Sequence, residues 1–231
     1  KLHNLLIYSI EDFSNYGKII IYDLKENNVI KIITVGHTPD MIKVNRNCTK
    51  ILVANEGEEI SNGIINPPGS LSIIDILHKQ KGDIKIKYDE LFFSTNVELI
   101  NSEYVSFLET KNNIYINIEP EYIALSQNED FALITLQENN AIAKVNLINN
   151  KIEFIKGIPF KSFQECKIDN NYDKVVNLKY SNILSSYQPD AIVLLDNKKN
   201  LFLIAGEGDA KKNDKVNISE NNVTFVSNYY L

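Results

Sequence analysis

The stretch that decides the fold runs from Pro120 to Asn139 and has the sequence PEYIALSQNEDFALITLQEN. It begins with a proline and an acid and continues into a short apolar segment, Tyr122–Ser126. A polar turn follows, then a second apolar segment, Phe131–Leu136, and an acidic loop. Short apolar runs rich in β-branched and aromatic residues, separated by Asn and Asp, are typical of antiparallel hairpins.

The same pattern occurs two more times in the chain. One copy begins at Pro39-Asp40 and reaches Glu56, and another begins at Pro189-Asp190 and reaches Glu207. Third strands are predicted at Ser70–Ile76 and Ala141–Leu147, and a fourth at Lys151–Lys156. Units of four antiparallel strands predict an all-β β-propeller with blades of the YVTN or WD40 kind.

The spacing of the repeats sets the expected organisation. The repeat prolines lie 81 and then 69 residues apart, whereas a blade needs only about 40–45 residues, so we expect long insertions or additional blades between the copies. The chain has no Met at its start and begins directly in a strand-like segment, which we interpret as a fragment of a longer protein, hence a partial ring. The expected divisions are the outer three strands of one blade (1–38), a blade with an insertion (39–118), a blade with a long loop (119–187) and the start of the next blade (188–231).

Acidic residues recur at two positions of each repeat. In a propeller blade, the connection into the first strand and the loop between the second and third strands emerge on the same face. The repeat therefore predicts a rim of carboxylates around the central channel. Such an oxygen-rich site suits Ca²⁺ or another hard divalent cation, and unpaired carboxylates at close range raise one another's pKa. The candidate metal ligands are Asp40, Glu56, Glu121, Glu138, Asp190, Glu207 and Asp209.

Two other interpretations of these acids stay open. Each acid beside a proline can be a solvated turn residue or cap a neighbouring amide. Alternatively, the rim can face a basic group, because Lys211 and Lys212 follow the third acidic loop directly.

Composition excludes several classes of protein. The net charge of −6 argues against a nucleic-acid-binding protein, and no apolar run is long enough to cross a membrane as a helix. Two cysteines, Cys48 and Cys166, cannot form a disulfide-dense scaffold or a four-thiolate zinc site, and whether they pair with each other is left open. The chain contains neither a Gly-x-Ser-x-Gly nucleophile motif nor a glycine-rich phosphate loop.

The repeat segments resemble the choice-of-anchor I domain family. Its first signature is similar to Thr38–Met41 and Ile51–Glu58 followed by Pro68–Asp75, its second to Glu119–Ala124 with Thr135–Ala141, and its third to Tyr187–Ile192 with Gly206–Ala210. The chain departs from the family pattern at Gly206, where Asn is usual, at Lys211, where Arg is usual, and at Pro68, where Glu is usual. The resemblance implies an extracellular or cell-surface β-propeller, and the family domain is longer than this chain.

Two functions follow as expectations. The first is a binding or scaffold propeller whose acidic rim holds a metal ion or an unknown surface or small-molecule ligand. The second is a Ca²⁺-dependent phosphoesterase, since some members of the family are described as alkaline-phosphatase-like. The residues favour binding, because no nucleophile or general base is identifiable and Arg46, the only arginine, lies in a predicted turn away from the rim. A third possibility is a purely structural piece of an ectodomain.

Overall fold

A computed structural model gives the fold of the chain. It describes residues 4–12, 15–58, 66–80, 83–95, 100–101, 103–106, 110–111, 114–115, 117–169, 173–196, 201–206, 217–218 and 223–225. These residues form β-strands and one short 3₁₀ helix, with no α-helix among them.

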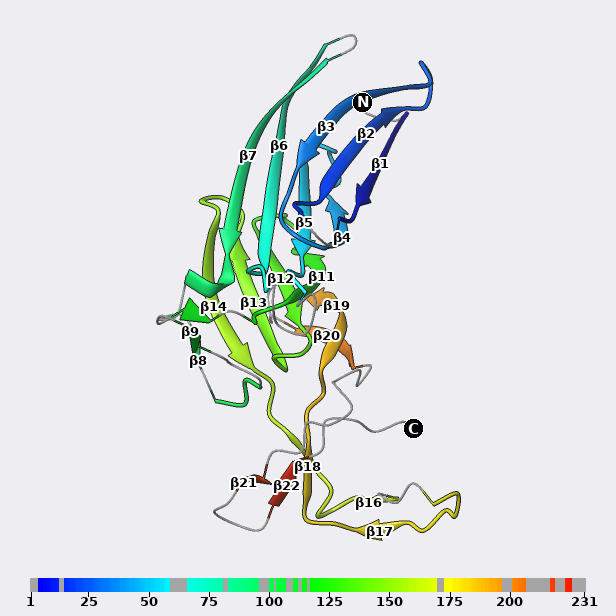
Figure 1. Ribbon diagram of the computed structural model, residues 1–231, viewed down its shortest axis with the longest axis vertical. Coiled ribbons are helices and arrows are strands. Elements are labelled where there is room, and N and C mark those ends of the chain that lie inside the picture. Colours follow the sequence, from blue (N-terminus) through cyan, green and yellow to red (C-terminus); the bar gives the residue numbers. More distant parts are fainter. Residues whose placement is uncertain are drawn as a thin grey trace.

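Two complete blades form the body of the molecule (Figure 1). In each, the strands follow one another in chain order and pair antiparallel, as predicted for a four-stranded blade. The first comprises β4 (Pro39–Val44), β5 (Lys50–Asn55), β6 (Ser70–Gln80) and β7 (Asp83–Phe92), with the 3₁₀ helix η1 (Phe93–Thr95) after it. The second comprises β11 (Pro120–Leu125), β12 (Phe131–Leu136), β13 (Ala141–Asn146) and β14 (Lys151–Gly157), to which β8 (Ile100–Asn101) adds a parallel fifth strand.

Two incomplete sheets flank these blades. The first sheet has β1 (Leu5–Ile10), β2 (Lys18–Asp23) and β3 (Asn28–Thr34), and the last has β19 (Pro189–Asp196) and β20 (Leu201–Gly206). Strand β11 contacts β4, β5 and β19, so the first strands of successive blades lie side by side. Within the described residues the sheets form an open arc rather than a closed ring. The predicted all-β propeller with four-stranded antiparallel blades in a partial ring is therefore confirmed.

Gly17 and Gly69 show how the first sheet relates to the blades. A Cβ at Gly17 would collide with Pro39, and a Cβ at Gly69 would come within 2.7 Å of Cδ of Pro120. Each glycine thus precedes a strand and packs against the proline that opens the next blade. By this correspondence, β1, β2 and β3 occupy the places of β5, β6 and β7.

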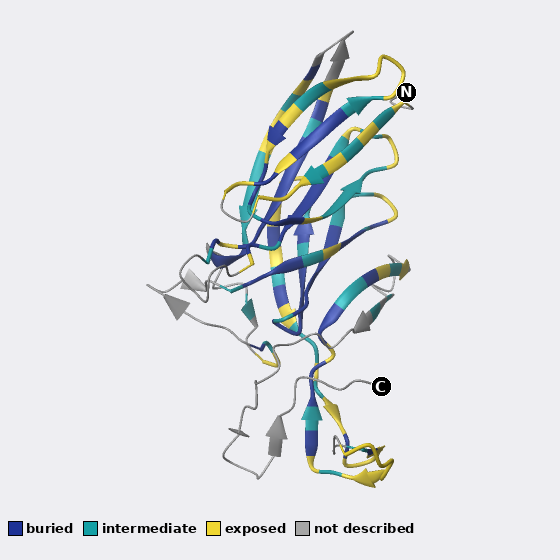
Figure 2. Ribbon diagram, turned by 45° about the vertical axis from the view of Figure 1, so that its right-hand side comes forward, coloured by how far each residue is buried: buried dark blue, intermediate teal, exposed yellow. Residues whose placement is uncertain are grey.

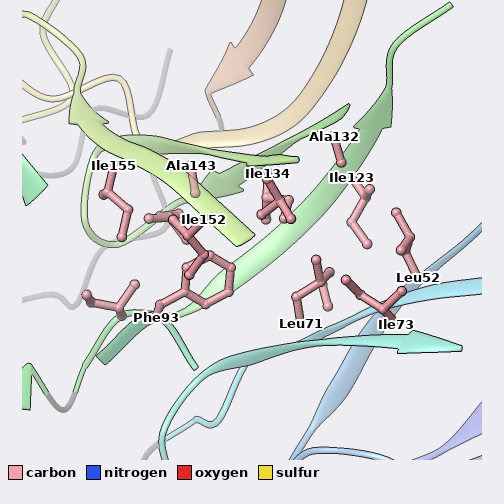
Figure 3. Packing of buried hydrophobic residues seen from close by; sticks show 14 of the residues in the cluster. Leu52, Leu71, Ile73, Phe93, Ile123, Ala132, Ile134, Ala143, Ile152 and Ile155 are labelled. Carbon is pink, nitrogen blue, oxygen red and sulfur yellow. The ribbon is translucent and has the colours of Figure 1, made fainter. Parts of the chain in front are cut away.

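Three apolar cores fill the spaces between successive sheets. One joins the sheet of β1–β3 to the first complete blade, and a smaller one joins the second blade to β19 and β20. The largest lies between the two complete blades, where Leu52, Leu71 and Ile73 face Ile123 and Ile134 (Figure 3). Burying each such side chain contributes roughly 1.5–3 kcal/mol, so the contact between blades, not a single central core, stabilises the arc.

The segments that lie between the repeat copies differ in structure. Between the first two repeat copies, β7 completes the first blade, whereas β8, β9 (Thr110–Lys111) and β10 (Ile114–Tyr115) are short. Within the blade expected to carry a long loop, the described residues of 164–177 are largely exposed (Figure 2), although one short strand lies among them and another follows. The strands outside the blades after β14 are β15 (Lys161–Ser162), β16 (Lys167–Ile168), β17 (Lys179–Tyr180), β18 (Ile183–Ser185), β21 (Asn217–Ile218) and β22 (Val223–Phe225). Strand β22 pairs with β18 and with β21, in a sheet that also contains β15, so β21 and β22 do not extend the sheet of β19 and β20.

Candidate functional site

Five acidic residues lie at one end of the inner strands. Asp40, Glu121 and Asp190 are the second residues of β4, β11 and β19, while Glu56 and Glu138 follow β5 and β12. Pairing of Pro39 with Asn55 brings the start of β4 opposite the end of β5, and the backbone N–H of Glu56 donates to the carbonyl of Thr38 at 2.9 Å. We call Asp40, Glu56, Glu121, Glu138 and Asp190 the acidic cluster.

A β-bulge marks each inner strand at its acid. The pairing register shifts between Pro39 and Met41, between Pro120 and Ile123, and between Pro189 and Ala191. An extra residue at such a point leaves the ladder and redirects its side chain. The repeat therefore contains both the acid and a β-bulge that sets the direction of its side chain.

The carboxyl groups of the acidic cluster act strongly on one another. Burial, followed by repulsion from Glu138 and other carboxylates, raises the pKa of Glu56 to about 8. Burial and the charges of Glu56, Glu138, and then the two inner-strand aspartates raise the pKa of Glu121 to about 9. Since the main charged groups acting on both side chains are carboxyls, Glu56 and Glu121 hold protons near neutral pH.

Asp40 and Glu121 share a hydrogen bond. Burial, followed by the charge of Asp190, raises the pKa of Asp40, whereas the hydrogen bond from Glu121 opposes that rise. A proton is needed between two carboxyl oxygens, and because this hydrogen bond lowers the pKa of Asp40, Asp40 accepts it and Glu121 donates. One blade thus supplies the protonated acid and its neighbour supplies the carboxylate.

Two asparagines in the turn between β12 and β13 position the segments that carry the acids. Asn139 Oδ1 accepts the backbone N–H of Glu119 at 3.2 Å, directly before Pro120 and Glu121. Asn140 Oδ1 accepts the N–H of Gln188 at 3.2 Å, directly before β19. Both side chains therefore fix the approach of the chain to an inner strand.

Thr135 adds a link between the second blade and β19. Its hydroxyl donates to the backbone carbonyl of Asp190 at 2.8 Å and accepts the N–H of Tyr122 at 2.9 Å. A single β-strand residue thus holds two neighbouring inner strands together within one residue of their acids.

Neutral polar atoms are also buried beside the acidic cluster. Thr38 and Gln188 each precede the proline that opens an inner strand, and both side chains are almost completely buried. Thr38 Oγ1 and both amide atoms of Gln188 make no hydrogen bond within the described structure. A buried polar group without a partner costs about 1–3 kcal/mol, so these atoms mark a place where a further polar group would be stabilising.

The structure brings together five of the seven predicted site residues. Glu207 and Asp209 lie outside the described residues, as do Lys211 and Lys212. Among the described residues, no three His, Cys, Asp or Glu side chains surround a common point closely enough to hold a metal ion. Cys48 and Cys166 are both free thiols.

Sequence reasoning missed two acids and the residues that position the cluster. Glu58 and the buried Glu119 both contribute to raising the pKa of Glu56. Glu119 directly precedes Pro120, and this position next to the repeat acid is the sequence feature that could have identified it. Asn139 and Asn140 carry no charge and gave no sign of their role beyond their place in a conspicuous Asn-Asn pair.

Comparison with known protein families shows which family the chain belongs to. The choice-of-anchor I domain matches residues 6–227. The chain belongs to this family. The match covers both complete blades and the acidic cluster, and it confirms the resemblance found in the repeat segments. No curated protein matches this choice-of-anchor I chain.

Several solved structures are similar to the choice-of-anchor I chain. The Cps50 (Swd1) β-propeller domain of Myceliophteria thermophila has a TM-score of 0.45 and 8% identity, over 82% of this chain and 45% of that structure. Kuenenia stuttgartiensis hydrazine synthase has a TM-score of 0.49 and 9% identity, over 88% and 55%. A functionally unknown protein from Desulfotomaculum acetoxidans has a TM-score of 0.41 and 11% identity, over 66% and 37%. The chain spans about half the length of these structures, or less. In the described part of the chain, no helix is long and apolar enough to cross a membrane.

Proposed function

We propose that the chain is a binding propeller whose acidic cluster takes up a divalent cation, Ca²⁺ foremost. The observation that carries the proposal is the convergence of carboxyl groups from three successive sheets, dense enough to raise the pKa of Glu56 to about 8 and that of Glu121 to about 9. A cation among these groups would replace mutual repulsion with attraction and would displace their protons.

The donor set fits a hard cation in its chemistry. Asp40, Glu56, Glu121 and Glu138 offer carboxylate oxygens, and the buried oxygens of Thr38 and Gln188 are neutral donors of the kind that complete Ca²⁺ sites. Because the side chains do not yet surround one point, binding would require the carboxyl groups to draw together. The ion would then be structural or would bridge the propeller to a ligand.

The family supports a proposal for where the protein is located. Its description as a choice-of-anchor domain suggests proteins that are secreted or attached to a surface. We infer an extracellular or cell-surface location, where Ca²⁺ is abundant enough to fill sites of weak affinity.

Thermal denaturation with added cation tests the proposal. A ligand that binds only the folded chain stabilises it by RT ln(1 + [L]/Kd), which is about 2.7 kcal/mol at one hundred times Kd. We expect millimolar Ca²⁺ to raise the melting temperature by several degrees, Glu56→Gln to remove most of that rise, and Glu26→Gln, in the exposed turn between β2 and β3, to leave it unchanged. Absence of a shift with Ca²⁺, Mg²⁺ and Mn²⁺ alike contradicts the proposal.

Phosphate ester hydrolysis is the alternative function for the same cluster. There the cation would polarise a phosphate and activate water, and the carboxyl groups would serve as its ligands. Release of phosphate from a generic monoester separates the two functions. Ca²⁺-dependent release that disappears in Glu56→Gln favours the phosphoesterase, whereas cation binding without release favours the binding propeller.

A further inference from the structure

A pocket lies at the opposite end of the inner strands from the acidic cluster. It has a volume of about 500 Å³ and is lined by the ends of β4, β11 and β19 and by the hairpin turns after β4 and β11. Three sheets of the arc therefore contribute to it, as they do to the acidic cluster. Neither the family match nor the similar structures assign this pocket a role.

The charged side chains of the pocket are mainly basic. Lys43 from β4 and Arg46 from the following turn both line it, and Glu129 from the turn after β11 is the one acid among the lining residues that the structure describes. Oε1 of Glu129 accepts the backbone N–H of Arg46 at 2.7 Å. This bond holds the two turns together and engages the carboxylate with the peptide backbone. In the described part of the chain, neither Lys43 nor Arg46 forms an ion pair.

The rest of the wall is mixed, with the polar side chains of Ser126 and Gln127 beside several apolar ones. Leu125 ends β11, and Leu194 and Leu195 lie near the end of β19, with Leu195 half exposed. The pocket is a partly open hollow in which polar and charged groups converge beside a few leucines, and convergent polar groups of this kind fix the orientation of a small ligand. The combination here, two cations beside leucines, suits an anionic head group attached to an apolar body.

The carboxylates of the acidic cluster lie too far from the pocket to repel an anion there strongly. Asp40 and Val44 are separated by four residues of an extended strand, or roughly 13 Å at about 3.3 Å per residue. Charges farther apart than the Debye length of about 8 Å are largely screened in physiological salt. An anion in the pocket would therefore experience Lys43 and Arg46 far more than the carboxylates at the other end, in spite of the net charge of −6.

We propose that this pocket binds a small organic anion through Lys43 and Arg46. The head group is a phosphate or a carboxylate, which the planar guanidinium of Arg46 can hold with two parallel hydrogen bonds while Lys43 adds a point charge. The apolar body of the ligand packs against the half-exposed Leu195, while Leu125 and Leu194 also pack against the cores between the sheets. The site is separate from the acidic cluster and needs no metal ion.

Calorimetric titration of the chain with three probes tests the proposal, each in the absence of divalent cations. The probes are inorganic phosphate, phenyl phosphate and benzoate. We expect at least one aromatic probe to bind with Kd of about 1 mM or lower and more tightly than inorganic phosphate, because only the aromatic probes reach the leucine wall. Comparison of phenyl phosphate with benzoate identifies the preferred head group.

Matched variants connect the binding to the named residues. Arg46→Gln is expected to weaken binding at least tenfold, Lys43→Gln to weaken it severalfold, and Arg46→Lys to give an intermediate affinity because it keeps charge but loses the planar fork. Lys151→Gln, an exposed lysine at the start of β14, is the control and should bind as the parent chain does. Arg46 is exposed in a turn, and far-UV circular dichroism of each variant verifies folding.

Two results would overturn the proposal. One is the absence of binding by any probe up to about 10 mM. The other is equal affinity in Arg46→Gln and Lys151→Gln, which would place binding elsewhere. Failure of the cation titration at the acidic cluster would leave these measurements unaffected, because they are made without metal.

Discussion

Asn140 and Gln188 are joined across two sheets by a hydrogen bond from the Gln188 backbone N–H to the Asn140 Oδ1, 3.2 Å long. The same oxygen accepts the N–H of Tyr187 at 2.9 Å. The amide nitrogen of Asn140 donates to the carbonyls of Tyr104 at 3.1 Å and Ile158 at 2.7 Å. One buried side chain thus anchors the segment that leads into β19, and Asp190 follows Gln188 by two residues.

Replacement of Asn140 should therefore destabilise the arc strongly. Asn140→Ala removes four hydrogen bonds, leaves partly buried backbone groups and the buried N–H of Gln188 without these partners, and strains a residue whose φ is 49°. We expect a loss of about 2–4 kcal/mol in the free energy of unfolding, measured by urea denaturation. Asn140→Asp keeps the accepting oxygen but places a second carboxylate oxygen against the carbonyls of Tyr104 and Ile158, so it should lose at least as much.

The control for this change is Asn27→Ala. Asn27 also has a positive φ, 53°, but is exposed and makes one side-chain hydrogen bond, from the hydroxyl of Tyr22. Its replacement should cost at most about 1 kcal/mol. Similar losses at the two positions would show that backbone strain, rather than the hydrogen bonds of Asn140, dominates.

The repeat in the sequence was sufficient to predict the blades. Proline, acid and alternating apolar segments are local features, and the pairing of β11 with β12 follows from a hairpin of short range. The convergence of Asp40, Glu121 and Asp190 could also be anticipated, because each inner strand begins in the same way.

The remaining features depend on contacts that no local pattern contains. Asn140 reaches Gln188 across 48 positions of the sequence, and the turn at Arg46 reaches Glu129 across 83. The basic pocket was missed for this reason. Arg46 was correctly placed in a turn away from the acids, but the leucines at the ends of β11 and β19 that make this turn part of a pocket come from other blades.

Gly69 is expected to tolerate no side chain. A Cβ there would collide with the carbonyl of Ile118 and approach the carbonyl oxygen of Glu56 at 2.8 Å, so the backbones of two blades would have to separate. We predict that Gly69→Ala lowers the free energy of unfolding by about 2–4 kcal/mol, measured by chemical denaturation. Pro68→Ala, at the exposed neighbouring position, should change it by less than about 1 kcal/mol. Equal effects would assign the loss to the loop rather than to the contact between blades.

Stability should decrease as pH rises through neutrality. The folded chain keeps protons on Glu56 up to about pH 8 and on Glu121 up to about pH 9, whereas glutamates of the unfolded chain release theirs near 4.5. Between those limits the folded state binds more protons, so the free energy of unfolding falls with increasing pH. We expect a melting temperature several degrees higher at pH 6 than at pH 9 in the absence of divalent cations.

Glu121→Gln isolates the contribution of the acidic cluster to this dependence. The amide imitates the protonated acid without titrating, so the variant should be more stable than the parent chain at pH 9, by about 1–3 kcal/mol, and should show a flatter profile. Glu26→Gln should keep the parent profile, since Glu26 is an exposed turn residue. A parent profile that is already flat between pH 6 and pH 9 would contradict the raised pKa values.

Cation affinity should increase over the same range of pH. If the acidic cluster binds Ca²⁺ as proposed, the ion must displace the protons that Glu56 and Glu121 hold at neutral pH. Release of both protons would strengthen the affinity about a hundredfold for each pH unit below pH 8. Between pH 8 and pH 9 only Glu121 still holds its proton, so the gain should fall to about tenfold and end near pH 9. Calcium titrations at pH 6, 7, 8 and 9 measure this dependence, and calorimetry in two buffers of different ionisation enthalpy counts the protons released. Glu121→Gln should release fewer protons at every pH. Binding that releases no protons would show that the ion lies away from these two side chains, even if it stabilises the chain.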